Sequence, residues 1–255
     1  MPGDSRRAAI VIGGIAIIGL AAYLYFSGPS APPPARAEAP PPAAKPAPPA
    51  DDFEHIDLPA LDDSDTLVRQ RLGALSSHPL VKAWLGTKGL IRNFVVVVEN
   101  ISHGMNPSGH LRVLKPTGSF LVTKRGTQTV IDPRNYERFS GIADAAASID
   151  ARMAGRLYNS FKPLLQMAYD ELGNQEPFDR AVERSILDLA RVPVVEQDIE
   201  VEMNGEGIGY EYADLRFENL NGAQKQLLRM GPKNVRVIQE QLRVFANAAH
   251  LSVAP

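Results

Sequence analysis

Five basic residues near the C-terminus have a spacing that would suit an anion-binding face. Lys225 and Arg229 are four residues apart, which places them on one face of a helix. Three more follow a Gly231-Pro232 break, namely Lys233, Arg236 and Arg243. Ammonium and guanidinium groups bind phosphates, carboxylates and acidic protein surfaces. We therefore identify a candidate interaction face, which consists of Lys225, Arg229, Lys233, Arg236 and Arg243.

The same cations could instead form ion pairs within the protein. Acidic residues lie just upstream of them, namely Glu200, Glu202, Glu211, Asp214 and Glu218. Exposed ion pairs are common on protein surfaces, and each stabilises the fold by only about 0.2–1 kcal/mol. We therefore favour internal pairing over a binding role for these cations.

The sequence predicts no catalytic, cofactor or metal site. The chain has no cysteine, which excludes disulfides, thiolate metal ligands and a cysteine nucleophile. His103 and His110 flank a loop, but a zinc site needs a third ligand, so we expect solvated histidines. No G-x-S-x-G elbow occurs, and the glycine-rich residues 205–209 lack a phosphate-binding lysine. Enzyme activity is therefore the less favoured hypothesis.

The charge balance argues against nucleic-acid binding. The chain contains 27 Lys and Arg against 29 Asp and Glu, with a formal net charge of −2. A nearly neutral protein has no long-range field that would gather DNA or RNA. We therefore expect no nucleic-acid partner.

Helical spacing dominates residues 53–255. Ile91, Phe94, Val98 and Ile101 recur at intervals of three and four, although the β-branched run 95–98 would also suit a strand. We choose a helix there. Asp150 is the predicted N-cap of the longest helix, with one apolar face at Met153, Leu157, Phe161, Leu164 or Leu165, Ala168 and Leu172.

Further helices are expected toward the C-terminus. Asn221 with Gln224 resembles a capping box, and Pro232 is placed at a helix start. The last helix has an apolar stripe at Val235, Ile238, Leu242, Phe245 and Ala249. This stripe covers only about two heptads, which favours packing within the domain over a coiled-coil dimer.

Two short β-rich pairs interrupt the helices. Residues 119–123 and 127–131 flank Lys124-Arg125-Gly126, which has the composition of a hairpin turn. Residues 199–201 and 208–212 form a second, weaker pair. The predicted fold class is mainly α with small β-hairpins (α+β).

Residues 224–234, QKQLLRMGPKN, resemble the C-terminal signature of an uncharacterised domain family. That family occurs in proteobacterial proteins with a single N-terminal membrane span. Further matches lie at Leu58-Pro59-Ala60-Leu61, at Pro163-Leu164-Leu165-Gln166 and at Leu172-Gly173. The resemblance implies an anchored domain of unknown function and brings no catalytic residues with it.

The N-terminal part has the composition of a membrane anchor followed by a spacer. Residues 8–26 are apolar and uncharged, and as a helix they would be about 28 Å long, close to the ~30 Å of a hydrocarbon core. Arg6 and Arg7 precede this run, and the next basic residue is Arg36, which predicts a cytoplasmic N-terminus. We predict a cytoplasmic tail at 1–7 and a single-pass transmembrane helix at 8–26.

Residues 27–52 contain ten prolines and many alanines, which favour a disordered, extended spacer. A cleaved signal peptide is the alternative to the anchor, because Ala35-Arg36-Ala37 has the A-x-A form. The apolar run is longer than the usual ~7–15 residues of a signal peptide, so we favour the anchor. Residues 53–255 would then form a periplasmic domain of the bacterial inner membrane.

Two hypotheses for the function follow. The first is an anchored periplasmic domain that binds an envelope protein or a cell-wall polymer. The alternative is an envelope hydrolase that acts on peptidoglycan or peptide through a carboxylate site. A deep cleft with two converging carboxylates would favour the enzyme, and an apolar patch beside the basic face would favour binding.

Overall fold

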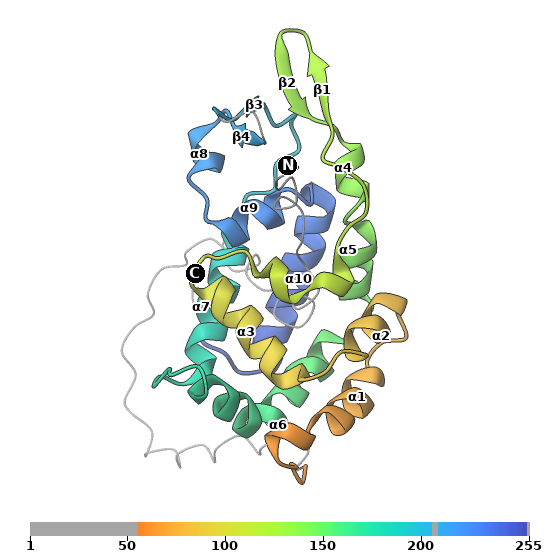
Figure 1. Cartoon of the computed structure of the whole chain (residues 1–255), viewed down its shortest axis with the longest axis vertical. Coiled ribbons are helices and arrows are strands. Elements are labelled where there is room, and N and C mark those ends of the chain that lie inside the picture. The colour runs from red at the N-terminus through yellow and green to blue at the C-terminus, as the bar shows by residue number, and fades with distance from the viewer. Residues whose placement is uncertain (1–55, 206–208, 254–255) are drawn as a thin grey trace, which may run out of the picture.

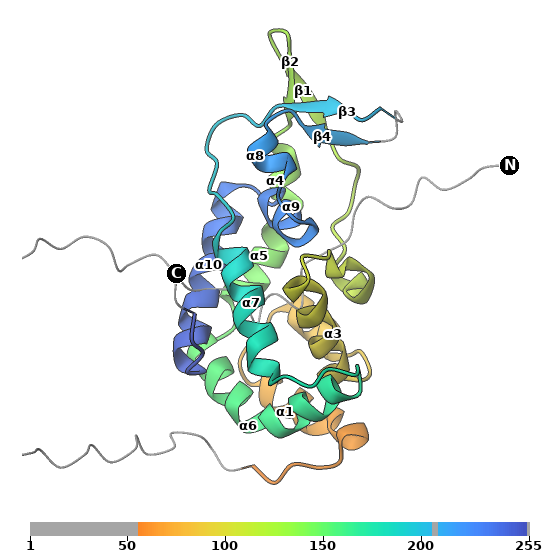
Figure 2. The same cartoon turned by 90° about the vertical axis from the view of Figure 1, so that its left-hand side faces the viewer.

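The computed structural model describes residues 56–205 and 209–253. Within these ranges the chain is mainly helical with two small antiparallel hairpins, and it forms an elongated body (Figure 1). The hairpins lie together at one end of the body, and helix α6 lies at the other (Figure 2). The predicted class, mainly α with small β-hairpins, is confirmed for this part of the chain.

The predicted tail (1–7), transmembrane helix (8–26) and spacer (27–52) lie outside the described residues. Among the helices within residues 56–205 and 209–253, none is long and apolar enough to cross a membrane. The anchor and the spacer therefore stay predictions from the sequence.

The described chain begins with four helical elements, of which the last is the longest. Their bounds are η2 (Leu61–Asp63), α1 (Asp65–Gly73), α2 (Pro79–Leu85) and α3 (Leu90–Ser102). The Asp65 carboxylate accepts hydrogen bonds from the backbone N–H groups of Gly89 and Leu90 at 2.9 and 2.8 Å. These donors lie at the N-terminus of α3, where a negative charge is stabilising. Residues 95–98 are helical, as predicted, because α3 is buried on most of its surface.

The next elements lead from α3 to the end that carries the hairpins. They are η3 (Pro107–His110), η4 (Arg112–Leu114), β1 (Val122–Arg125), β2 (Gln128–Ile131), α4 (Arg134–Glu137) and α5 (Ser140–Ala147). Arg125 lies opposite Gln128, so the turn consists of Gly126 and Thr127. The predicted hairpin is confirmed, but Lys124 and Arg125 belong to β1 and not to the turn. Gly126 has φ 59°, the left-handed conformation that a two-residue hairpin turn requires.

The long helix α6 (Ala151–Asp170) begins after Asp150, whose side chain accepts hydrogen bonds from two backbone N–H groups, as predicted. Its predicted apolar face is partly wrong. Met153 is 45% exposed and Leu172 is 46% exposed, whereas Ala154, Gly155 and Tyr158 are buried. The reason is a close crossing with the last helix. A Cβ at Gly155 would lie 2.7 Å from the Ala248 side chain, so small residues occupy the interface.

The C-terminal half contains α7 (Phe178–Ala190), β3 (Val201–Met203), β4 (Tyr210–Tyr212), α8 (Leu215–Glu218), α9 (Gly222–Leu228) and α10 (Pro232–Ala248). Asn221 and Gln224 form the predicted capping box at the start of α9. All five residues of the predicted C-terminal stripe are buried, namely Val235, Ile238, Leu242, Phe245 and Ala249. The stripe therefore packs within the domain.

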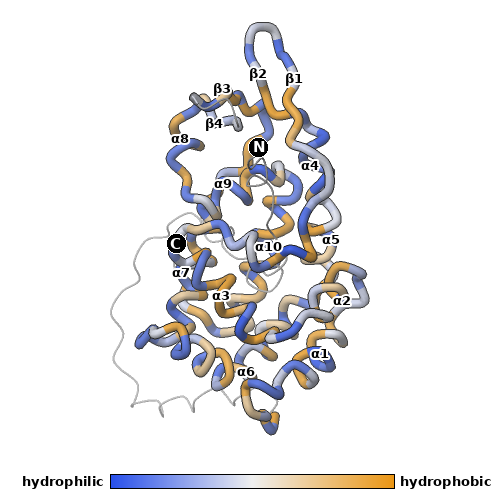
Figure 3. The backbone as a smooth tube through the Cα atoms, in the orientation of Figure 1, coloured by the Kyte–Doolittle hydropathy of each residue, from blue (hydrophilic) through white to orange (hydrophobic). Residues whose placement is uncertain are grey.

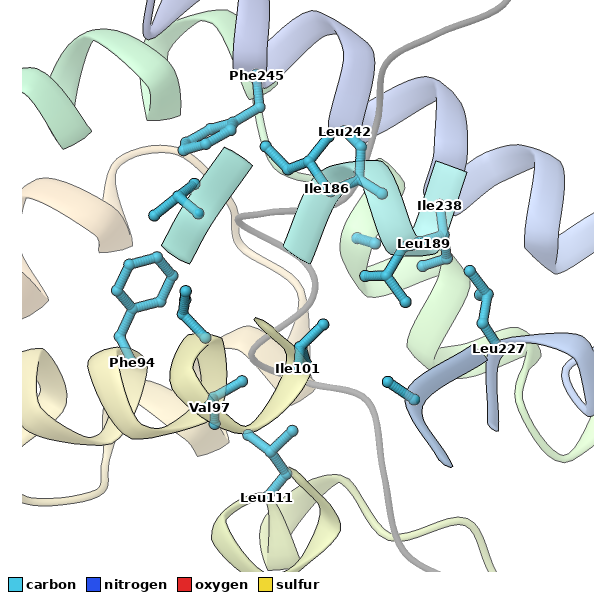
Figure 4. Close-up of a cluster of buried hydrophobic side chains, with 14 of the residues drawn as sticks. Phe94, Val97, Ile101, Leu111, Ile186, Leu189, Leu227, Ile238, Leu242 and Phe245 are labelled. Carbon is cyan, nitrogen blue, oxygen red and sulfur yellow. The ribbon is translucent and has the colours of Figure 1, made fainter. Parts of the chain in front are cut away.

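One hydrophobic core joins the helices. Figure 4 shows side chains of α3, α7, α9 and α10 meeting at its centre, among them Ile101, Ile186, Leu227 and Leu242. Figure 3 shows hydrophobic and hydrophilic residues alternating along these helices, the pattern of amphipathic helices that face a core. Burial of this apolar area is the main stabilising contribution to the fold.

The two hairpins contact each other where they leave the helical body. The Ile131 N–H donates to the Ile199 carbonyl at 2.9 Å, and Val130 pairs with Glu200 in an antiparallel bridge. The Arg125 guanidinium also lies 3.3 Å from the Asp198 carboxylate. These contacts set the position of the second hairpin, which carries the surface described next.

Candidate functional site

The predicted cationic face is divided between two environments. Lys225 of α9 forms an ion pair with Glu218 of α8, one of the acidic partners considered from the sequence. The Arg229 guanidinium lies over the Tyr212 ring, 5.9 Å from its centroid, which is a cation–π contact. Both cations therefore bind groups of the second hairpin and of α8, and they hold α9 against them.

The other three cations lie on α10. Arg236 pairs with Glu196, and Arg243 pairs with Glu240 one turn earlier on the same helix. Lys233 is exposed in the first turn of α10. Two of these three positive charges are thus balanced by a carboxylate in direct contact.

The loop histidines have the solvated environment expected from the sequence. The His103 side chain lies 3.5 Å from the Glu99 carboxylate, and both His103 and His110 are exposed. No group of three or more histidine, cysteine or acidic residues that could hold a metal ion occurs within residues 56–205 and 209–253.

A hollow of about 260 Å³ between α6 and the start of α7 bears on the hydrolase hypothesis. Its lining contains one carboxylate, that of Asp179. Tyr158 donates a hydrogen bond to this carboxylate, and the Lys162 ammonium binds it at 2.9 Å. Burial, the hydrogen bond to Asp179 and the nearby acidic charges raise the pKa of Tyr158 well above its usual value. The hollow does not contain the two converging carboxylates that the hydrolase hypothesis requires.

An apolar and aromatic surface covers one face of the second hairpin. Met203 lies opposite Tyr210, and Val201 lies opposite Tyr212. Side chains two residues apart on a strand share a face, so these four side chains form one apolar face of the hairpin. Val201 and Tyr212 are buried in the core, whereas Met203 is 63% exposed. The face thus runs from the core out to solvent.

Neighbouring elements extend this surface. The Phe120 ring, from the segment before β1, lies 5.8 Å from the Tyr210 ring. Helix α8 packs against β4, and its Phe217 ring lies 6.1 Å from Tyr212. Leu215, the first residue of α8, is 70% exposed. We use the name hairpin platform for the residues linked by these contacts together with the exposed Leu215 of α8; they are Phe120, Met203, Tyr210, Tyr212, Leu215 and Phe217.

Arginines complete the platform. The Arg216 guanidinium lies over the Phe217 ring at 5.7 Å, and it also forms an ion pair of 2.6 Å with Asp214. Arg229 covers Tyr212 in a similar way. Met, Tyr, Phe and Arg are residue types that are enriched in protein–protein interfaces. The reverse face of the hairpin is acidic, because Glu202 and Glu211 lie directly opposite each other and are exposed.

The signature residues 224–234 form most of α9 and the start of α10, behind the platform. Gly231 separates α9 from α10 with φ 83°, and the Tyr136 ring of α4 lies against it. Asn234 is buried and donates to the backbone carbonyls of Tyr136 and Met230 at 2.9 and 2.8 Å. Leu227, Leu228 and Met230 are fully buried in the core. In this structure the signature is a packing motif.

Tyr136 makes the stability of this region sensitive to alkaline pH. Burial, together with the nearby Tyr212 and Asp198, raises the pKa of Tyr136 to about 12. The folded state therefore favours the neutral phenol, and its contribution to stability is present below pH ~10 and is lost as the pH rises toward 12. We expect the free energy of unfolding, measured with urea, to fall across that range. Tyr136→Phe should make the fall shallower, whereas an unchanged slope would contradict the assignment.

Sequence reasoning missed the hairpin platform. Its nearest signal was the alternation Tyr210-Glu211-Tyr212, which places two aromatic rings on one face of a strand. The contact of Phe120 with Tyr210 joins residues far apart in the chain, so no local pattern could have indicated it.

The comparisons with known proteins identify a family but no activity. The model of the family described as "Protein of unknown function (DUF3014)" matches residues 90–246, and the chain belongs to this family. No curated protein and no solved structure matches the chain. The matched region contains all the residues of the platform and of the signature.

Proposed function

We propose that this DUF3014 domain is a protein-binding module of the bacterial envelope and that the hairpin platform is its partner surface. The observation that carries the proposal is the exposure of Met203 and Leu215, at 63% and 70%, next to aromatic rings covered by arginines. Large apolar side chains lose favourable burial energy when they stay in water. A partner that covers them would recover that energy.

The platform is also built to be rigid, which favours binding. Tyr212 is buried, its backbone N–H donates to Glu218 at 2.9 Å, and Lys225 holds the same carboxylate. The Arg229 guanidinium also lies over the Tyr212 ring. A surface whose side chains are already ordered loses little conformational entropy when a partner binds.

The predicted cationic face has two roles in this proposal. Lys225 and Arg229 stabilise the platform, Lys225 through its ion pair with Glu218 and Arg229 through its contact with the Tyr212 ring. Lys233, Arg236 and Arg243 add positive charge along α10, where salt would screen it. Affinity would come mainly from the apolar platform, because rim charges change association rates more than affinity.

The location of the module is part of the proposal. The apolar run at 8–26 would anchor the chain in the inner membrane, with residues 1–7 in the cytoplasm. The proline-rich residues 27–52 would separate the anchor from the periplasmic domain, with a contour length of up to about 80 Å. The partner would then be a protein within this distance of the membrane.

A photo-crosslinking phenylalanine analogue at position 210, directly opposite Met203 and unchanged in the variants below, would test the platform in living cells. We expect it to capture a defined protein, and we expect the double variant Met203→Glu/Leu215→Glu to abolish the complex. Interface residues of this kind cost about 2 kcal/mol or more when removed, which corresponds to roughly a thirtyfold loss of affinity. Both positions are exposed, so the melting temperature should change little.

A matched control is available on the same chain. Met167→Glu/Leu172→Glu makes the same two substitutions at residues that are 49% and 46% exposed but lie at the end of α6, away from the platform. This variant should keep the complex. Retention of every crosslinked protein by the platform variant would refute the proposal.

A further inference from the structure

A second hollow, between α1 and α6, has a different chemistry. It has a volume of about 240 Å³, and its lining consists of Arg71, Ala74, Leu75, Met153, Arg156, Leu157 and Ser160. Two guanidinium groups from different helices thus line one small hollow whose remaining walls are mostly apolar. Small-molecule pockets usually have volumes of about 300–1,000 Å³, so this hollow better fits side chains of a peptide segment.

The described chain begins close to this hollow. Leu58 packs against the core, and η2 contacts α6. Figures 1 and 2 both show the first described residues, in orange, beside α1 and α6. An extended chain covers at most about 3.6 Å per residue, so every residue from 51 to 55 must lie within about 18 Å of Ile56.

The residues just before this point have the complementary chemistry. Asp51, Asp52 and Glu54 carry three negative charges, and Phe53 lies between them. They follow the proline-rich run and precede the domain. Carboxylates form the strongest ion pairs with guanidinium groups, through two parallel hydrogen bonds, and a phenyl ring suits apolar walls.

We propose that the α1–α6 hollow binds the acidic segment of the same chain formed by Asp51, Asp52, Phe53 and Glu54. Carboxylates of this segment bind Arg71 and Arg156, and Phe53 packs against Leu75 and Leu157. The contact fixes the point at which the spacer leaves the domain. The end of the body that contains α1 and α6 would therefore face the anchor. The hairpin platform, at the opposite end, would stay accessible to a partner.

Proteolysis of the full chain in detergent tests the proposal. A chymotrypsin-like protease cleaves after Phe53, and the rate of cleavage reports how often that residue is released when opening is fast. We expect Arg156→Glu to accelerate cleavage after Phe53 about tenfold, which corresponds to about 1.4 kcal/mol. Cleavage by trypsin after Arg36, which precedes Ala37 and lies outside the segment, should not change.

Controls on the same helix make the result specific. Arg152→Glu reverses a charge one turn earlier on α6, at an exposed residue that does not line the hollow, and should leave cleavage after Phe53 unchanged. The charge exchange Asp52→Arg/Arg156→Glu should restore at least part of the protection. Because the chain has no cysteine, Phe53→Cys/Ala74→Cys provides a second readout, and mild oxidation should form an intramolecular disulfide.

Two results would overturn the proposal. The first is equal cleavage after Phe53 in the wild type, Arg156→Glu and Arg152→Glu. The second is stabilisation of the wild type, but not of Arg156→Glu, by inorganic phosphate without any change in cleavage after Phe53. That second result would mean that the hollow binds an anion from solution.

Discussion

Leu228→Ala is expected to destabilise the domain by about 2–5 kcal/mol. Leu228 lies near the C-terminal end of α9, within the signature, and only 1% of its surface is exposed. Removing three carbon atoms from a buried leucine loses their burial energy and leaves a cavity among side chains that cannot fully collapse. A domain of this size is typically stable by only about 5–15 kcal/mol, so this loss would be a large fraction. Urea denaturation monitored by circular dichroism would measure it.

Leu172→Ala is the matched control, because the same atoms are removed from a residue that is 46% exposed. We expect this change to cost less than about 0.5 kcal/mol. If Leu228→Ala left the midpoint of unfolding unchanged, the signature would not be a packing motif. Its residues would then have to be reconsidered as a recognition site.

The helices could be predicted because their signals are local. The steps of three and four in α3 and α10 depend only on helix geometry, and the capping box of Asn221 and Gln224 uses side chains three residues apart. The first hairpin could be predicted for the same reason, since alternation and a glycine turn are local too.

The buried face of α6 shows where local reasoning stops. Both Met153 and Ala154 fit helical spacing, and hydrophobicity alone favours methionine as the core residue. The structure buries Ala154 and Gly155 instead, because α10 crosses α6 so closely that only small side chains fit. That crossing is a property of two helices separated by the 61 residues 171–231, so the sequence of α6 does not reveal it.

The candidate site was predicted still less completely, for the same physical reason. The charges of Lys225 and Arg229 could be read directly, but their partners Glu218 and Tyr212 are fixed by how α8 and β4 pack against α9. Exposure of Met203 and Leu215 depends equally on long-range packing. A residue type is local information, whereas the surface to which it contributes is a property of the whole fold.

Gly231→Ala is the second change expected to have a large effect, again about 2–5 kcal/mol. Two costs combine at this position. Gly231 has φ 83°, a conformation that costs a residue with a Cβ about 1–2 kcal/mol. The new Cβ would also lie 2.3 Å from the Tyr136 ring, and overpacking of a tight contact typically costs about 1–3 kcal/mol.

Gly89→Ala separates these two costs. Gly89 also has a positive φ, 65°, but a Cβ there meets no atom within 4 Å, so we expect only the backbone cost of about 1–2 kcal/mol. Tyr136→Leu removes the ring, so the double variant Gly231→Ala/Tyr136→Leu should be more stable than the sum of the single effects predicts. Strict additivity, or equal losses for Gly231→Ala and Gly89→Ala, would show that the ring does not confine position 231. The glycine of the signature would then be explained by its backbone conformation alone.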